Sequence, residues 1–272
     1  MNRQQIPGHK CENARIAAVE HLLRATARAE ARHFWFRGFR AFVAPLIQTA
    51  LARSAARVAI LDCGCGTGAN VEWLGRYGRA CGFDLSQIGL RIGLEAGRTR
   101  LTRATVAAAP FQSARFDLVT SFDVLYSLED GVEAAAIAEM YRVLKPGGHA
   151  IVNVAAMNLL RGDHSVLSHE VRRYSRRDLR VRLEAAGFSI VRLTYTNATL
   201  VPPLLAARFV QRWRGLRPET EAETEIRVPP EPVNALMSLV MRLEAVWIRR
   251  FDAPFGSSLL CLAQKPVGAG DR

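Results

Sequence analysis

The sequence predicts an α/β fold in which a doubly wound sheet of seven strands carries helices on both faces. Short apolar runs alternate with segments of helical spacing, and the first apolar run ends in an acid and three alternate glycines. Strands that alternate with helices form parallel sheets, because the chain must cross the sheet before each new strand. The predicted strands span residues 58–62, 80–84, 102–106, 116–122, 149–154, 188–195 and 257–264.

The chain before the first strand predicts an N-terminal helical segment, residues 1–56. Residues 14–32 are rich in alanine, arginine, leucine and glutamate, and Ile16 and Val19 have the spacing of one helix face. The aromatic run 33–37 breaks this polarity, which indicates that the helix ends there. We expect this segment to cover the substrate side of the sheet as a lid.

Turn and capping residues mark the later helices. Pro146 to Gly148 ends a helix predicted at residues 134–143, since proline and glycine stop helices and form turns. Ser175 has the position of an N-cap, and Gly187 ends the helix that follows.

A long insertion precedes the last predicted strand. Residues 196–256 contain an apolar helix at 200–213, an acid-rich linker and an amphipathic helix at 233–250. One interpretation is a helical cap that walls the substrate pocket. The other is an interfacial surface for peripheral membrane contact, because Trp213 and Trp247 beside apolar residues and arginines suit anionic headgroups. The predicted divisions are 1–56 for the lid, 57–195 for the core, 196–256 for the insertion and 257–272 for the closing strand and tail.

The composition limits the classes of partner and location. The formal charge is +12, but Lys10, Lys145 and Lys265 are the only lysines, so arginines scattered along the chain carry most of it. A nucleic-acid site usually gathers its charge into one stripe, so a nucleic-acid partner is disfavoured. Five cysteines form no even disulfide framework, which favours a reducing, cytoplasmic location. The chain shows no secretion signal and no apolar run of transmembrane length.

The glycine turn indicates a site for a nucleoside. Gly64, Gly66 and Gly68 would let the backbone approach a ligand at the carboxyl end of the first strand. The spacing lacks the Gly-Lys-Ser/Thr of a triphosphate site. A second acid, Asp84, ends the next apolar run at the spacing of a residue that binds ribose hydroxyls.

Four motifs in order resemble those of class I S-adenosylmethionine-dependent methyltransferases: Leu61 to Gly68, Asp84, Phe116 to Val119 and Leu144 to Gly148. The resemblance covers residues 57–191 most strongly. It implies a Rossmann-like fold and S-adenosyl-L-methionine as cofactor. In this family the last two strands usually form a hairpin, so the insertion before the last strand is a departure.

The resemblance also implies the residues that hold the cofactor. Asp62 and the glycine turn would hold its methionine part, Asp84 its ribose and Leu85 its adenine. Thr105 stands where the family usually has an acid near the adenine, so the backbone of the next two residues would carry more of that recognition. The full set of expected cofactor residues is Asp62, Gly64, Cys65, Gly66, Gly68, Asp84, Leu85, Val106, Ala107, Ser121 and Phe122.

The expected catalytic residues lie outside the core, because the family's histidine after the fourth strand is replaced here by Leu125-Tyr126-Ser127. Candidates are His33, His164 and His169 as base or acceptor ligand, with Tyr174 as an orienting hydroxyl. No metal is expected, because neither Cys63 and Cys65 nor the two later histidines have convergent further ligands.

These observations predict a methyltransferase that acts on oxygen or nitrogen of a small-molecule or lipid- or glycan-linked acceptor. One alternative is an RNA methyltransferase, although the sequence lacks the Asp/Asn-Pro-Pro-Tyr/Phe and Pro-Cys motifs of base methylation. The other is a protein that binds S-adenosylmethionine for chemistry other than methyl transfer.

Overall fold

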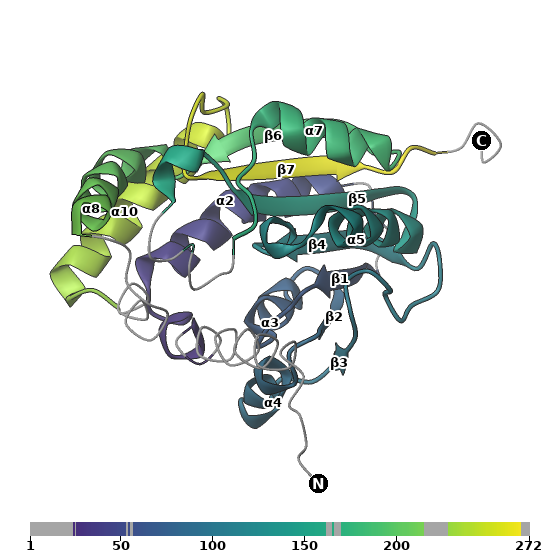
Figure 1. Cartoon of the computed structure of the whole chain (residues 1–272). Coiled ribbons are helices and arrows are strands. Elements are labelled where there is room, and N and C mark those ends of the chain that lie inside the picture. The colour runs from purple at the N-terminus through teal and green to yellow at the C-terminus, as the bar shows by residue number, and fades with distance from the viewer. Residues whose placement is uncertain are drawn as a thin grey trace, which may run out of the picture.

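The computed structural model describes residue 24 and residues 26–52, 54, 57–161, 165, 170–214 and 228–267. Within these residues a seven-stranded sheet has helices on both faces (Figure 1). The strands are β1 Ala59–Cys63, β2 Arg79–Asp84, β3 Leu101–Arg103, β4 Phe116–Phe122, β5 Leu144–Ala155, β6 Ser189–Thr196 and β7 Ser258–Gln264. The helices are α2 Phe34–Leu51, α3 Ala69–Leu74, α4 Gln87–Glu95, α5 Asp130–Val143, α7 Arg176–Ala185, α8 Val201–Arg214 and α10 Glu231–Ile248, with short 3-10 turns at Leu125–Ser127, Asn158–Leu160 and Ala198–Leu200.

The strand order is β3-β2-β1-β4-β5-β7-β6. Strands β1 to β5 are parallel to their neighbours, and β7 runs antiparallel between β5 and β6. The order reverses between β1 and β4, and open sheets of this kind bind ligands at the carboxyl ends of the strands beside such a reversal. The predicted doubly wound α/β fold is therefore confirmed.

Two apolar layers hold the sheet between its helices. One layer packs α5 and α7 on a face that includes Leu61, Val119 and Val152. The opposite layer packs α2, α3 and α10 on a face that includes Ile60 and Leu118. Neighbouring residues of β1 and β4 point to opposite layers, because side chains alternate along a strand. The central strands are therefore buried on both faces.

Two predicted strands differ from the structure by several residues at one end. The third strand ends at Arg103 rather than Val106, because the amide of Ala108 turns back to donate to the carbonyl of Thr105. The fifth strand begins at Leu144 rather than His149, so the Pro-Gly-Gly turn lies within an irregular stretch of β5.

The helical residues before the aromatic run stop at Ala29, close to the predicted end, and the run itself starts a second helix whose beginning our sequence analysis did not predict. Residues 26–29 are helical, and α2 begins anew at Phe34 with His33 as its N-cap. The imidazole nitrogen Nδ1 of His33 accepts the amide of Trp35 at 3.1 Å, and this bond satisfies a free donor of the first turn. Most of the helix predicted at 14–32 lies outside the described residues.

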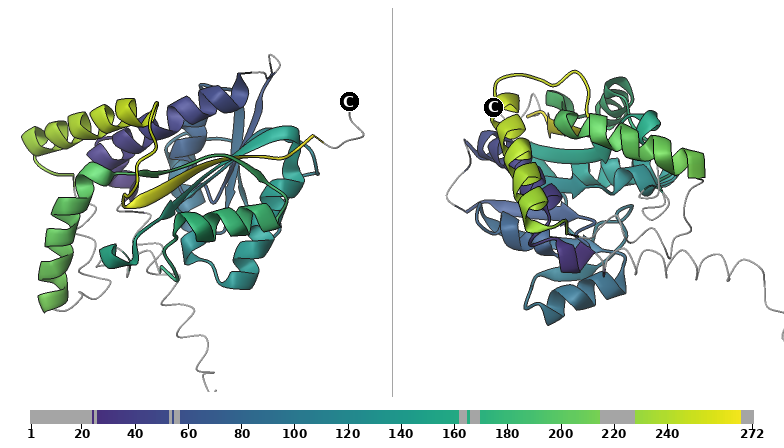
Figure 2. Two further views of the ribbon diagram at one scale, coloured as in Figure 1. Left: turned by 90° about the horizontal axis from the view of Figure 1, so that it is seen from above. Right: turned by 90° about the vertical axis from the view of Figure 1, so that its left-hand side faces the viewer.

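The insertion supplies α8 and α10, which lie at one end of the molecule, and α10 packs along α2 (Figures 1 and 2). Asn234 of α10 ties the two together: its Oδ1 accepts the amide of Phe34 at 2.8 Å, and its Nδ2 donates to the carbonyl of Arg32 at 3.0 Å. No helix of the described residues has the length and apolarity needed to span a membrane.

Candidate functional site

The glycine turn links β1 to α3 at the carboxyl edge of the sheet. Gly64, Gly66 and Gly68 all have left-handed backbone conformations, with φ of 78°, 55° and 77°. A side chain is strained in this conformation, so glycine is the residue suited to these positions. A Cβ at Gly64 would also lie 2.4 Å from Cγ2 of Val124, which follows β4. The turn therefore packs directly against the segment after β4.

Asp62 is buried beside this turn. Its Oδ1 accepts the hydroxyl of Thr120 on β4 at 2.6 Å, and its side chain has no cationic partner among the described residues. Burial raises the pKa of Asp62 to about 7, the charge of Asp84 adds to the rise, and the hydrogen bond from Thr120 opposes it. A buried acid of this kind gains most from a cationic ligand, because a nearby positive charge favours its ionised form.

Asp84 lies at the end of β2 and holds the same turn from the other side. Its Oδ2 accepts the amide of Gly66 and its Oδ1 accepts the amide of Ser86, each at 2.8 Å. Each carboxylate oxygen has a further lone pair with which it can accept a ligand hydroxyl. The next side chain, Leu85, is 62% exposed, so it offers an apolar surface beside this carboxylate.

The loop after β3 contains Val106 and Ala107, both half-buried. The amide of Ala107 makes a long bond of 3.4 Å with the hydroxyl of Thr105. Glu139 of α5 anchors the end of this loop, because it accepts the amide of Ala109 at 2.7 Å. A hydrogen bond from the neighbouring Arg142 lowers the pKa of Glu139 and keeps this anchor charged.

Ser121 and Phe122 end β4 and are almost fully buried. The ring of Phe122 packs edge-on against Phe39 of α2 at 4.9 Å between centroids. Cys65 is also buried within the turn, and burial raises the pKa of its thiol, so it behaves as a small apolar side chain. The contact of these residues with a cofactor stays a prediction.

Asp123 is an acid that our sequence analysis did not select. It directly follows β4, has a left-handed φ of 60°, and accepts Nδ2 of Asn153 from β5 at 2.9 Å. Its side chain is exposed at the carboxyl end of β4. Desolvation by neighbouring protein raises the pKa of Asp123, the charge of Glu170 adds to the rise, and the hydrogen bond from Asn153 opposes it.

Glu30 is a second residue that sequence reasoning missed. Its Oε2 accepts the hydroxyl of Thr67 in the glycine turn at 3.0 Å, and its Oε1 pairs with Arg98 at 2.9 Å. Glu30 is buried, so the ion pair and hydrogen bond offset the cost of removing its charge from water. The chain just before α2 is thus fastened to the glycine turn, and its role as a lid stays a prediction.

His33 is buried, and burial lowers the pKa of its imidazole, so the ring is neutral. Its Nδ1 caps α2, as described above, which leaves Nε2 as the nitrogen with capacity for another partner. A role of His33 toward an acceptor stays a prediction. His164 and His169 lie outside the described residues.

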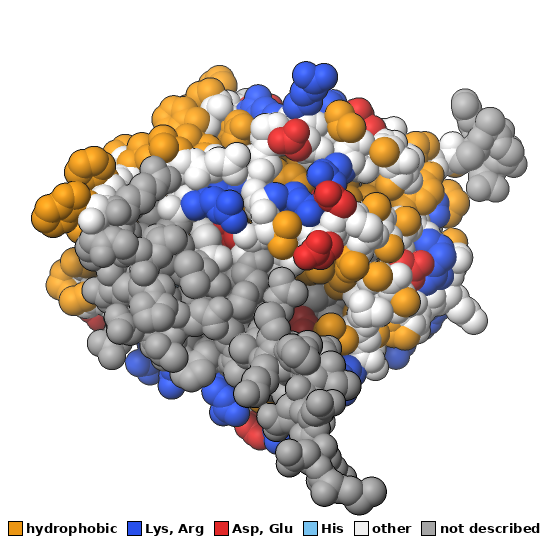
Figure 3. Space-filling view, in the orientation of Figure 1, with side chains coloured by type: hydrophobic (Ala, Val, Ile, Leu, Met, Phe, Trp, Pro, Cys, Tyr) orange, Lys and Arg blue, Asp and Glu red, His pale blue; other side chains and the backbone are white. Residues whose placement is uncertain are grey.

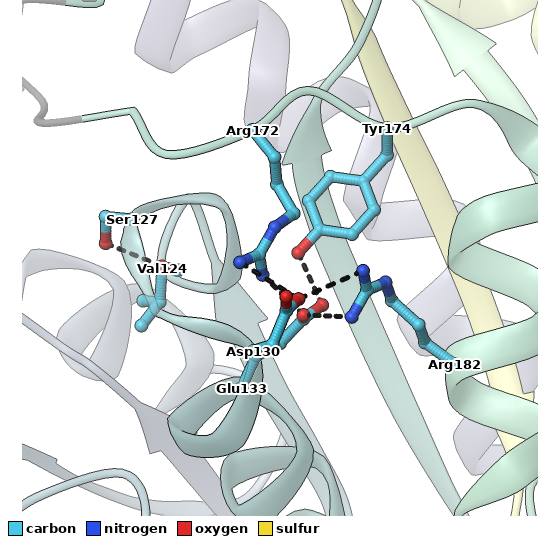
Figure 4. A network of polar contacts seen from close by, with 7 residues as sticks. All are labelled: Val124, Ser127, Asp130, Glu133, Arg172, Tyr174 and Arg182. Carbon is cyan, nitrogen blue, oxygen red and sulfur yellow. Dashed lines mark hydrogen bonds and ion pairs between the residues drawn. The ribbon is translucent and has the colours of Figure 1, made fainter.

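Tyr174 belongs to a buried ionic network (Figure 4). Its hydroxyl donates to Glu133 at 2.5 Å, and Arg172 and Arg182 donate to the other oxygen of that carboxylate, each at 2.5 Å. Glu133 is completely buried, so these three donors stabilise its charge. This network gives the Tyr174 hydroxyl a structural partner, and the orienting role expected for it stays a prediction.

The segment that replaces the family's histidine holds no base. The Ser127 hydroxyl donates to the carbonyl of Val124 at 2.8 Å (Figure 4). A neutral hydroxyl with this bond lacks the adjacent base that would activate it. The described residues contain no group of three His, Cys, Asp or Glu side chains that could hold a metal ion.

Residues 61–152 match a family model described as a methyltransferase domain. Over 103 residues the chain is 36% identical to a demethylmenaquinone methyltransferase of Lactiplantibacillus plantarum, which covers 34% of this chain and 43% of that protein. Over 108 residues it is 32% identical to a ubiquinone biosynthesis O-methyltransferase of Alkalilimnicola ehrlichii, which covers 36% and 42%. The chain thus spans less than half the length of these two relatives.

The fold is similar to that of the [4+2]-cyclase SpnF, with a TM-score of 0.52, 22% identity, and coverage of 82% of this chain and 80% of that chain. At this level of identity the similarity concerns the fold alone. Proteins with one fold can perform different chemistry, so function must be argued from the site.

Proposed function

Because the chain carries a class I S-adenosylmethionine-dependent methyltransferase domain, we propose that it transfers a methyl group from S-adenosylmethionine to oxygen or nitrogen of a small-molecule acceptor. When bound, this cofactor supplies a methyl group activated by its sulfonium. The protein binds the cofactor, aligns the acceptor behind the methyl group and excludes water. The glycine turn flanked by Asp62 and Asp84, at the carboxyl edge of a parallel sheet, is the observation that carries this proposal.

Three side chains around the glycine turn suit the amino acid part, the ribose and the adenine of the cofactor. Asp62 is a buried acid without a cationic partner among the described residues, and the cofactor's ammonium group is the charge that it lacks. Asp84 is fixed by two backbone amides and retains capacity to accept ribose hydroxyls. Leu85 offers an exposed apolar surface to adenine, which would remove that surface from water.

Asp123 is the described residue best placed to act on the acceptor. The next residue in the sequence, Val124, packs against Gly64 of the glycine turn, so Asp123 lies beside that turn. Its pKa is raised, and a base works best when its pKa approaches the working pH. We assign Asp123 to removal or binding of the acceptor's proton, and we retain His33, His164 and His169 as candidates for the same task. Tyr174 is retained only as an orienting hydroxyl.

The two relatives methylate quinone precursors according to their names, which supports a small-molecule acceptor for this chain. The lid residues Arg32 and Phe34 are tied to α10 by Asn234, so lid and insertion would wall one acceptor site together. A lipid- or glycan-linked acceptor is the narrower form of the proposal.

Transfer of radiolabelled methyl groups tests the proposed function. The full chain is incubated with methyl-labelled S-adenosylmethionine and a cell extract, which is then separated into small molecules, lipids, RNA and protein. We expect label in the small-molecule or lipid fraction, and Asp84→Ala should reduce it at cofactor concentrations below the dissociation constant of the variant. Label confined to RNA would favour the RNA alternative. Cofactor binding without label in any fraction would favour chemistry other than methyl transfer.

Asp123→Asn tests the assignment on the acceptor side once an acceptor is known. It should lower turnover by about 10²–10⁴-fold, the usual contribution of a general base, with cofactor affinity unchanged. Asn keeps the size of the side chain and one acceptor oxygen, so the hydrogen bond with Asn153 is preserved. Unchanged turnover would exclude Asp123 as the base and leave the three histidines for the same test.

A further inference from the structure

Helix α10 has an unusual distribution of polar side chains. Its buried face includes Asn234, Ser238 and Glu244, each at most 6% exposed. The apolar Met241, Ala245 and Ile248 complete that buried face. The solvent face is apolar as well, with Leu236, Leu239, Leu243, Val246 and Trp247 each 46–62% exposed. These five side chains follow the i, i+3, i+7 spacing of one helix face, so they form a continuous stripe. A soluble helix normally places its apolar stripe against the core.

The stripe continues beyond the helix. The ring of Trp247 lies 5.7 Å from that of Phe251, which is 56% exposed, and Phe255 is 47% exposed. Helix α8 adds Phe209 and Trp213 at the same end of the molecule, with 75% and 87% of their surfaces exposed. Hydrophobic side chains gather over this end in the space-filling view (Figure 3). Exposed apolar side chains gathered at one end of a molecule indicate an interaction surface.

Exposed cationic side chains border the stripe. Arg242 and Arg249 lie along one edge of the exposed face of α10, and Arg250 follows its last turn. Glu231 is the exposed acid on the helix, at its first residue, while the nearby Asp252 is paired with Arg192 at 2.9 Å. The rim of the stripe is therefore positive where the apolar side chains are densest.

We propose that the stripe of α10, with Phe251 and the exposed aromatic residues of α8, docks onto an anionic lipid surface. Apolar side chains would enter the boundary between headgroups and acyl chains, and the bordering arginines would attract anionic headgroups. Tryptophan suits this boundary because its ring is apolar and its N–H can bond to water or headgroups.

A second copy of the chain fits the stripe less well than a lipid surface does. A two-fold interface presents the same patch from both copies, so it would bring the arginine rims of two molecules close together. Like charges at the edge of an apolar contact oppose association. An anionic lipid surface pairs with the same arginines, so the charge favours this partner.

The docking stands independently of the proposed methyl transfer. Asn234 at the start of α10 joins the helix to the lid, and Glu30 joins the lid to the glycine turn. A docked α10 would therefore be connected, through these contacts, to the lid and to the glycine turn.

Cosedimentation with lipid vesicles tests the proposal. The full chain should bind vesicles of phosphatidylcholine mixed with phosphatidylglycerol, and bind vesicles of phosphatidylcholine alone much more weakly. The double variant Leu239→Gln/Leu243→Gln should lower partitioning by about tenfold or more, since each leucine loses its apolar burial. Arg242→Gln and Arg249→Gln should each lower it by about fivefold on anionic vesicles.

Val181→Gln provides the matched control. Val181 is 55% exposed on α7, which lies on the other face of the sheet, so its loss should leave partitioning unchanged. Light scattering on the free protein tests the alternative that a second copy of the chain covers the stripe. If the wild type is a dimer that Leu239→Gln/Leu243→Gln converts to a monomer, and neither binds vesicles, the surface is a self-interface and the proposal is wrong. Equal binding of the wild type and the leucine variant to anionic vesicles would also overturn it.

Discussion

Replacement of Asp84 tests whether its carboxylate binds the cofactor. In the structure this group accepts the amides of Gly66 and Ser86, so it shapes the turn, and the proposed function assigns its remaining lone pairs to the ribose hydroxyls. Burial raises the pKa of Asp84, while the backbone hydrogen bonds lower it. Asp84→Ala removes the hydrogen-bond acceptors for the ligand and for both amides.

The expected loss of affinity follows from hydrogen bonds to a charged group. Such bonds contribute about 1.5–3 kcal/mol, and part of this is recovered when water enters the space left by alanine. We therefore expect S-adenosylhomocysteine to bind more weakly by about 1–3 kcal/mol, which is about 5- to 150-fold in the dissociation constant. Asp84→Asn should have a smaller effect, because it keeps one acceptor oxygen.

Isothermal titration calorimetry of the wild type and both variants measures these differences. Asp117→Asn is the matched control: Asp117 lies near the opposite end of β4, where it accepts the amide of Ala59 and pairs with Lys145, each at 2.8 Å. This variant should lose stability but not affinity. Equal affinity in the wild type and Asp84→Ala, or equal losses in Asp84→Ala and Asp117→Asn, would refute the reasoning.

Three further predictions concern stability and the turn. Burial raises the pKa of Asp62 from 3.8 to about 7, so the folded protein holds this proton to a higher pH than the unfolded chain does. The free energy of unfolding of the free protein should therefore fall by on the order of 1–4 kcal/mol as the pH rises from about 4 to about 7. Denaturant titration at each pH measures this change. Gly64→Ala places a Cβ against Val124 at a left-handed φ and should abolish S-adenosylhomocysteine binding in calorimetry. Tyr174→Phe leaves Glu133 with one donor fewer and should lower the free energy of unfolding by about 1–3 kcal/mol, with unchanged ligand affinity.

Each of these predictions has a contrasting variant. Asp62→Asn cannot ionise, so the difference in stability between the wild type and this variant should depend on pH over the stated window, and a pH-independent difference would contradict the pKa assignment. Gly131→Ala adds a Cβ in α5 where no atom lies within 4 Å, and it should leave ligand binding intact. If Tyr174→Phe lowers affinity for the ligand as well as stability, the hydroxyl does more than stabilise Glu133.

The cofactor half of the site is predictable because its signals are local. Three left-handed positions within five residues require glycine, and the acid that ends the next strand follows at a regular spacing. The order of the strands then brings both segments to one edge of the sheet. Local patterns along the chain therefore suffice for the turn, for Asp84 and for the predicted N-cap at Ser175, which the structure shows as part of a capping box with Asp178.

The acceptor half depends on contacts between distant segments. Asp123 gains its partner from β5 and its charged neighbour from Glu170, and neither contact is visible in the sequence around it. Its position after a strand end was a usable signal, since the same rule identifies Asp84. Glu30 reaches the glycine turn across 37 residues, so no local pattern marks it.

The start of α2 at the aromatic run was missed, although a helix does end just before it, because the composition of the run was given more weight than the capping signal at His33. His33 stands immediately before a helix, where a side chain that accepts an amide is favoured, but the preceding helical pattern made the run resemble a terminus. The structure uses His33 to start α2, and the aromatic residues pack that helix against the core.

A crystal structure of the full chain with S-adenosylhomocysteine tests the central claim most directly. The account predicts ribose hydroxyls within hydrogen-bond distance of Asp84, the amino group beside Asp62, adenine against Leu85, and the vacated methyl position open toward Asp123. A ligand bound elsewhere, or a ligand in the turn whose sulfur faces away from Asp123, would contradict it.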